Sequence, residues 1–183
     1  ILINATVLPN PQLVQAIEML PPNRVLVKGE QAIALKVDQA QAEAFFAQQL
    51  SPNIEAVETD AAFIQLRHIW DLFKLNAPAL EEDFALLTKG RNSKPLSSTN
   101  QVIGDPSRIF LEEGASAECA VFNTENGPIY LGKNAKVMEG ALIRGGLALC
   151  EHAQLKMGAK IYGAATFGPY VKIGGEVTNS VFL

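Results

Sequence analysis

Hydrophobic residues return at every sixth position between Leu131 and Thr178. Eight aliphatic or aromatic residues hold the first recurring position: Leu131, Val137, Ile143, Leu149, Leu155, Ile161, Phe167 and Ile173. Four residues after each comes a second apolar residue, mostly alanine or valine: Ala135, Ala141, Leu147, Ala153, Ala159, Ala165, Val171 and Val177. A period of six fits neither a helical turn nor the simple alternation of a strand. The pattern therefore predicts a solenoid of short units that stack around a shared core.

Each unit of six residues is typical of one short strand followed by one corner. Two inward positions flank a single outward residue, which is the alternation of a strand. Turn pairs join the strands, for example Lys133-Asn134, Glu139-Gly140 and Gly145-Gly146. Gly and Asn tolerate the left-handed backbone conformation of a sharp corner. An irregular glycine-rich β structure is the alternative, but a chance run of eight units is improbable.

Glycine usage divides the chain near residue 90. Only Gly29 and Gly90 lie in the first 90 residues, and the other 12 of the 14 glycines follow. We expect a small α/β region at 1–90, a turn-rich linker at 91–102 and the solenoid at 103–183. The chain opens on Ile1 inside an apolar run, and no capping element follows Leu183. We therefore expect a fragment whose solenoid is truncated at its C-terminal end.

The first 90 residues alternate between strand and helix signals. The expected elements are a strand at 1–8, a helix at 12–20, a hairpin with arms at 24–28 and 32–37, a helix at 40–49, and two helices between 60 and 87. In the last region Phe63, Ile69, Trp70 and Phe73 share one stripe. We therefore expect Trp70 to be buried.

Composition limits the classes of partner. The chain is 48% hydrophobic and has a net charge of −4. It contains no run of five basic residues, so we expect no nucleic-acid partner. No apolar stretch approaches the length of a membrane-spanning helix, so we expect no membrane partner either. The two cysteines, Cys119 and Cys150, have no CxxC neighbour, and the default expectation is a cytoplasmic protein.

The repeat resembles the hexapeptide motif of left-handed parallel β-helix acyltransferases. The matching units are Leu131-Gly132-x-x-Ala135, Phe167-Gly168-x-x-Val171 and Ile173-Gly174-x-x-Val177. The resemblance implies a mainly β fold. Its chain would form a left-handed, three-sided coil in which each hexapeptide forms one side. The spacing from Leu111 to Leu131 exceeds three hexapeptides by two positions, so we expect an insertion at 126–128.

Further segments resemble enzymes of sugar-nucleotide biosynthesis. Residues 69–76 look like the helix that leads from the catalytic domain of sugar-1-phosphate nucleotidyltransferases to their β-helix. Segments 123–132, 138–145 and 177–181 are similar to the alternative bifunctional form of UDP-N-acetylglucosamine diphosphorylase/glucosamine-1-phosphate N-acetyltransferase. The resemblance implies acetyl transfer from acetyl-CoA to an amino-sugar phosphate, coupled in the full protein to uridylyl transfer. The alternatives are a nucleotidyltransferase whose β-helix only oligomerises or regulates, and a non-catalytic scaffold.

The departures from this family concern its catalytic parts. Its nucleotidyltransferases begin with a strand and a Gly-rich loop bearing Arg and Lys, and such loops cradle phosphates. The first 90 residues here contain neither that loop nor an assignable Asp pair for Mg²⁺, so they resemble the tail of that domain. We expect Mg²⁺ to act only in the missing part and the fragment to be inactive in nucleotidyl transfer. The acetyl-transfer base of the family belongs to later coils, past Leu183.

The two histidines, His68 and His152, lie far apart in the sequence, which argues against a zinc site, and we expect no metal. His152 is a candidate general base. The favoured alternative is a polar corner residue, stacked in a column with Asn134 and Tyr170. His68 is expected to be structural.

A coil of three hexapeptides sorts the outward residues onto three faces. The first carries Lys136, Met138, Gln154, Lys156, Lys172 and Gly174; the second carries Leu142, Arg144, Lys160, Tyr162, Thr178 and Ser180; the third carries Ala148, Cys150, Thr166 and Gly168. Candidate groups for the phosphates of coenzyme A or a sugar phosphate are Lys136, Arg144, Lys156, Lys160, Tyr162 and Lys172; solvated surface cations are the alternative. Because the third face is small and uncharged, we expect it to pack inward in a homotrimer. The alternative is that an extra helix or loop covers it.

Overall fold

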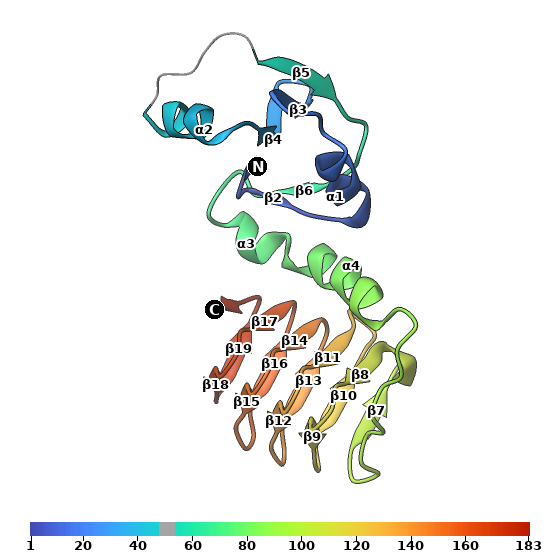
Figure 1. Cartoon of the computed structure of the whole chain (residues 1–183). Coiled ribbons are helices and arrows are strands. Elements are labelled where there is room, and N and C mark those ends of the chain that lie inside the picture. The colour runs from blue at the N-terminus through green and yellow to red at the C-terminus, as the bar shows by residue number, and fades with distance from the viewer. Residues whose placement is uncertain (48–53) are drawn as a thin grey trace. The chain divides into compact units, whose positions relative to one another are not determined.

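The computed structural model describes residues 1–47 and 54–183. The chain divides into two compact units, Ile1–Arg67 and His68–Leu183, and each has its own hydrophobic core. The fold is mainly β, and a small α/β region precedes a parallel-strand β-solenoid, as the sequence predicts (Figure 1). The predicted domain limits at residues 90 and 102 stay predictions.

In its described residues, the first unit contains a four-stranded sheet and a two-stranded one. The larger sheet has the order β1 (Leu2–Ile3), β4 (Gln31–Lys36), β3 (Arg24–Lys28) and β5 (Glu55–Glu58), and the smaller pairs β2 (Val7–Leu8) with β6 (Ile64–Gln65). Its helices among the described residues are α1 (Pro11–Glu18) and α2 (Gln39–Phe46). Its core comprises Val7, Leu13, Ile17, Leu20, Leu26, Ile33 and Ala34.

Local sequence signals explain most of these elements. The β3–β4 hairpin is confirmed, and helix α1 begins where the Asn10 side chain accepts a hydrogen bond from the Leu13 amide. The prediction of one strand at 1–8 is wrong, because the Thr6 amide donates to the Asn4 side chain and forms a turn between β1 and β2. A helix at α2 is confirmed, but its predicted end at residue 49 lies outside the described residues.

The prediction of helix throughout 60–87 is wrong in its first part. Residues 64–65 form strand β6, which pairs with β2, and the helices are α3 (Asp71–Lys74) and α4 (Asn76–Thr88). Strand pairing therefore overrides the helical spacing there. Trp70 is 48% exposed, so its predicted burial is also wrong. The helical stripe that would have buried it is interrupted, because strand β6 separates Phe63 from α3 along the chain.

The solenoid consists of three parallel sheets in the fully described second unit. The β7 sheet comprises β7 (Gln101–Ile103), β10 (Val121–Asn123), β13 (Leu142–Arg144), β16 (Lys160–Tyr162) and β19 (Glu176–Thr178). The β8 sheet comprises β8 (Ile109–Leu111), β11 (Ile129–Leu131), β14 (Leu147–Leu149), β17 (Ala165–Phe167) and β20 (Val181–Phe182). The β9 sheet comprises β9 (Ser116–Ala117), β12 (Lys136–Val137), β15 (Gln154–Leu155) and β18 (Lys172–Ile173). A short 3-10 helix, η1, spans Pro106–Arg108.

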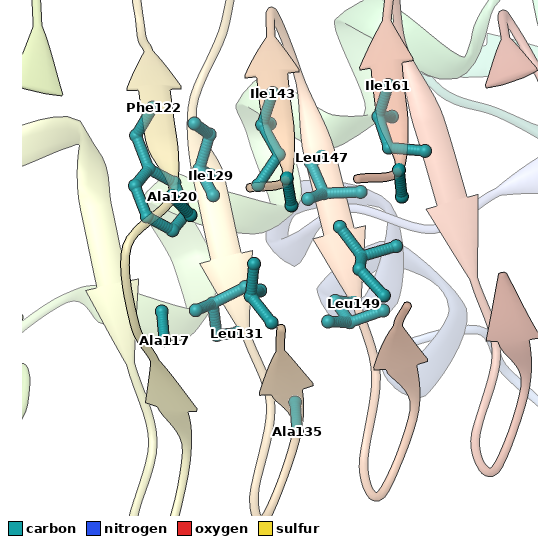
Figure 2. Packing of buried hydrophobic residues seen from close by; sticks show 14 of the residues in the cluster. Ala117, Ala120, Phe122, Ile129, Leu131, Ala135, Ile143, Leu147, Leu149 and Ile161 are labelled. Atoms are coloured by element: carbon teal, nitrogen blue, oxygen red, sulfur yellow. The ribbon is translucent and has the colours of Figure 1, made fainter. Parts of the chain in front are cut away.

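The six-residue period builds the solenoid core. Most residues at the recurring positions are almost fully buried, and Figure 2 shows Ile143, Leu147, Leu149 and Ile161 among them. Val171 and Val177, in the last coils, are partly buried. Equivalent side chains lie one above another because each strand pairs in parallel with the strand one coil later. The handedness of the coil stays a prediction.

The coil length varies at both ends of the solenoid. Leu131 pairs with Leu149, exactly three hexapeptides further along the chain, whereas the step from Leu111 to its partner Leu131 is longer by two positions. The link 124–128 between β10 and β11 is longer than the Gly145-Gly146 link of the next coil, which confirms the predicted insertion.

The predicted register of the last coil is wrong by two positions. Lys160 pairs with Glu176 and Tyr162 with Thr178, so Thr178 and Ser180 do not occupy the columns that a constant period gave them. The cause is a shorter corner, in which Gly174-Gly175 stands where the preceding coil has the longer segment 156–159. Gly175 has φ +78°, a conformation that suits glycine.

Helix α4 packs against strand β17 of the β8 sheet. The Leu80 side chain lies against Gly146, and the Thr166 hydroxyl donates a 2.8 Å hydrogen bond to the Asn76 side chain. The assignment of the third face to a subunit contact is therefore wrong at Thr166, because a helix of the same chain covers it. The small residues of this face allow that helix to approach closely.

Candidate functional site

The candidate site comprises the two solenoid faces formed by the β7 and β9 sheets. On the β9 sheet, Lys136, Gln154 and Lys172 form one outward column, because each is paired in register with the next. Neighbouring strands lie about 4.8 Å apart, so the Cα atoms of the two lysines are separated by roughly 10 Å. Lys156 lies in the adjacent column and donates a 2.8 Å hydrogen bond to the Gln154 side chain.

The cations of this column have no carboxylate partner within the described residues. Lys136 and Lys172 are both exposed, and no ion pair engages either ammonium group in the part of the chain that the structure describes. A bound phosphate would therefore not have to displace a carboxylate. This distinguishes the two lysines from Arg144 of the β7 sheet.

Two candidate residues of the β7 sheet lie next to carboxylates. The Tyr162 hydroxyl donates to Glu176, and this hydrogen bond raises the pKa of Tyr162. Arg144 lies 4.0 Å from Glu125, and both side chains are exposed, so this pair contributes little. Lys160 is exposed and belongs to no ion pair among the described residues.

One corner brings cations of the two faces together. Lys156 directly follows strand β15 of the β9 sheet. Lys160 is the first residue of β16, the next strand along the chain, which belongs to the β7 sheet. Met157 lies in the corner between them and is 73% exposed. This corner therefore presents two ammonium groups and an apolar thioether at one edge of the solenoid.

His152 occupies the opposite corner of the β9 sheet. Asn134, His152 and Tyr170 have φ between 56° and 64° and follow one another in successive coils. The His152 ring stacks on the Tyr170 ring at 4.9 Å between centroids, and its Nε2 lies 3.6 Å from a carboxylate oxygen of Glu151. This geometry supports the structural interpretation of His152, a member of a corner column.

Sequence reasoning missed the carboxylates that contact these basic and phenolic groups. Glu176 reaches Tyr162 only because the last coil is shorter, and the Gly174-Gly175 pair was the one signal of that shortening. It also missed Glu112, which binds both Arg91 and the Tyr130 hydroxyl. These hydrogen bonds hold the pKa of Glu112 below its ordinary value, and the bond from Tyr130 has the larger effect.

Within residues 1–47 and 54–183, no cluster of three or more His, Cys, Asp or Glu side chains could hold a metal ion. No helix in those same ranges is both long and apolar enough to cross a membrane.

The first half of the chain matches a known protein family. A family model described as sugar nucleotidyl transferase covers residues 1–92 of the 183-residue chain. No curated protein matches the chain.

Proposed function

The chain belongs to the sugar nucleotidyl transferase family, and from that premise we propose that its solenoid transfers an acetyl group from acetyl-CoA to an amino-sugar phosphate. In the full protein this step accompanies uridylyl transfer, as in the alternative bifunctional diphosphorylase/N-acetyltransferase. We place the protein in the cytoplasm, in keeping with the free thiols of Cys119 and Cys150.

One observation carries the proposal: exposed ammonium groups without carboxylate partners among the described residues are aligned on the β7 and β9 sheets. Lys136 and Lys172 are in register one coil to either side of Gln154, and Lys160 lies across the corner from Lys156. Both substrates carry phosphates, and lysine binds phosphate through charge-assisted hydrogen bonds. In this proposal the two lysines of the β9 column hold a phosphate of coenzyme A.

Acetyl transfer needs little more than positioning and removal of one proton. The amine of the sugar attacks the thioester carbonyl, a C–N bond forms, the C–S bond breaks, and coenzyme A leaves as the thiol. We assign no general base, since the His152 ring is stacked in its corner column.

We further propose a homotrimer. Because α4 covers part of the β8 sheet, subunits would meet through the β7 and β9 sheets, and the clefts between them would collect lysines from both. A closed three-fold ring is one of the common symmetric assemblies.

Calorimetry with coenzyme A tests the proposal. We expect Lys136→Gln/Lys172→Gln to bind coenzyme A at least about tenfold more weakly, because two charge-assisted contacts are lost. Lys89→Gln/Lys94→Gln removes the same charge near the end of α4 and should bind as the unmodified chain does. Equal losses in the two double variants would contradict a specific phosphate site.

The stacking of the His152 ring on Tyr170 supports a second candidate, a solenoid that only oligomerises or regulates a nucleotidyltransferase. Release of coenzyme A thiol in the presence of acetyl-CoA and an amino-sugar phosphate separates the two. An assembled full-length protein that makes sugar nucleotide but releases no thiol would favour the second candidate.

A further inference from the structure

A groove of about 580 Å³ lies beside the junction of α3 and α4, within the second unit. On one side it is lined by Phe73 and Lys74, and on the other by Asn126, Gly163 and Asn179 from the solenoid corners. None of these residues belongs to the lysine-bearing columns of the candidate site. The groove is therefore a separate feature of the molecule.

Three polar side chains of this groove have no hydrogen-bond or ion-pair partner among the described residues. Among the described residues, the side-chain amides of Asn126 and Asn179 make no hydrogen bond, whereas Asn100 uses its amide to join Ala117 and Ala120. The Lys74 ammonium lies 5.9 Å from the centre of the Trp70 ring and belongs to no ion pair in the described part of the chain. Within the described part of the chain, these three donor groups of one groove are thus without a hydrogen-bond acceptor or a carboxylate partner.

The corner that carries Asn179 has a side chain where the two preceding coils have glycine. Gly145, Gly163 and Asn179 follow one another in register, and all have positive φ, at 97°, 73° and 44°. The Asn179 side-chain oxygen occupies the space where a Cβ on Gly163 would lie. Glycine would satisfy the backbone at this corner as well, so the backbone alone does not explain the asparagine.

We propose that this groove binds a hydroxylated ring compound that carries one anionic substituent. Lys74 is the one charged side chain of its lining, all of which is described, so it matches a single carboxylate or phosphate. The amides of Asn126 and Asn179 can donate to and accept from ring hydroxyl groups. The Phe73 side chain, 45% exposed, offers an apolar face for the ring. This inference does not depend on acetyl transfer.

Calorimetry with glucose 6-phosphate, glucuronate, glucose and inorganic phosphate tests the groove. Glucose 6-phosphate and glucuronate are the two ring anions, because each combines a hydroxylated ring with one anionic group. We expect at least one of them to bind at least about tenfold more tightly than glucose or inorganic phosphate alone. Binding of inorganic phosphate as tight as that of glucose 6-phosphate would overturn the proposal. So would the absence of binding to both ring anions.

Two variants localise the binding. Asn179→Gly removes the amide but keeps a residue suited to positive φ, and Lys74→Gln removes the charge; each should weaken binding about tenfold or more. The melting temperature of Asn179→Gly should stay that of the unmodified chain, which excludes unfolding as the cause. Lys89→Gln, just past the end of α4 and outside the lining of the groove, should bind as the unmodified chain does. Undiminished binding in the two groove variants would overturn the proposal.

Discussion

The hydroxyl of Thr166, on strand β17, donates a hydrogen bond of 2.8 Å to the side-chain oxygen of Asn76, at the start of helix α4. Asn76 is only 8% exposed, and its side-chain nitrogen has no partner among the described residues. The pair therefore joins helix and solenoid through a buried polar contact that is only partly satisfied. Such a contact fixes the position of the helix more than it adds stability.

This relationship predicts non-additive substitutions. Thr166→Val should destabilise the second unit by about 1–3 kcal/mol, because it leaves Asn76 buried with no hydrogen-bond partner. The double variant Asn76→Leu/Thr166→Val should be more stable than Thr166→Val alone, since both polar groups are then gone. Urea unfolding measures both values. Additive losses would show that Asn76 reaches water.

Two glycines predict different costs for the same substitution. A Cβ on Gly132 would lie 2.9 Å from backbone atoms of Cys150 and Glu151, so Gly132→Ala must push two coils apart and should cost about 2 kcal/mol or more. A Cβ on Gly158 meets nothing within 4 Å, and its φ of +68° should cost about 1 kcal/mol for alanine. A larger loss for Gly158→Ala in urea unfolding would contradict the stacked-coil geometry.

Tyr130 predicts a loss of stability in alkali. Burial, followed by the hydrogen bond to Glu112, raises the pKa of Tyr130 to about 12. Because the folded pKa lies above the ordinary value near 10, this stabilisation is complete below about pH 10 and is lost as the pH rises through 12. Tyr130→Phe should flatten the dependence of unfolding free energy on pH in that window.

The control for this titration is Tyr170→Phe, which removes an exposed hydroxyl. In a tyrosinate absorbance titration, the component near pH 12 should vanish in Tyr130→Phe and persist in Tyr170→Phe. Persistence of that component in Tyr130→Phe would show that another tyrosine produces it.

The part of the fold set by local spacing could be predicted from the sequence. The period of six places Ile143 and Ile161 in one buried column because each coil stacks directly on the last. The last coil could not be predicted, since Gly174-Gly175 fits both a full unit and a shortened corner. The cover over Thr166 could not be predicted either, because it depends on how a distant helix packs.

The candidate site shows the same limit. The alignment of Lys136 with Lys172 follows from the hexapeptide period and is found in the register of the β9 sheet. The groove at Lys74 combines a helix junction with two corners, at Asn126 and Asn179, that lie far along the chain from it. No periodicity relates such positions, so only the packed structure brings them together.

Trp70 and Phe167 predict opposite outcomes for the loss of a large aromatic side chain. Trp70 is 48% exposed and stacks on the His68 ring at 4.5 Å, so Trp70→Ala should cost no more than about 1 kcal/mol. Phe167 is fully buried among the solenoid coils, and Phe167→Ala should cost about 3–5 kcal/mol. Because Trp70 is the single tryptophan, its fluorescence offers an independent check: acrylamide should quench it readily in the folded protein. Fluorescence shielded from acrylamide, together with a large loss of stability in Trp70→Ala, would mean that the ring is buried as the helical spacing had predicted.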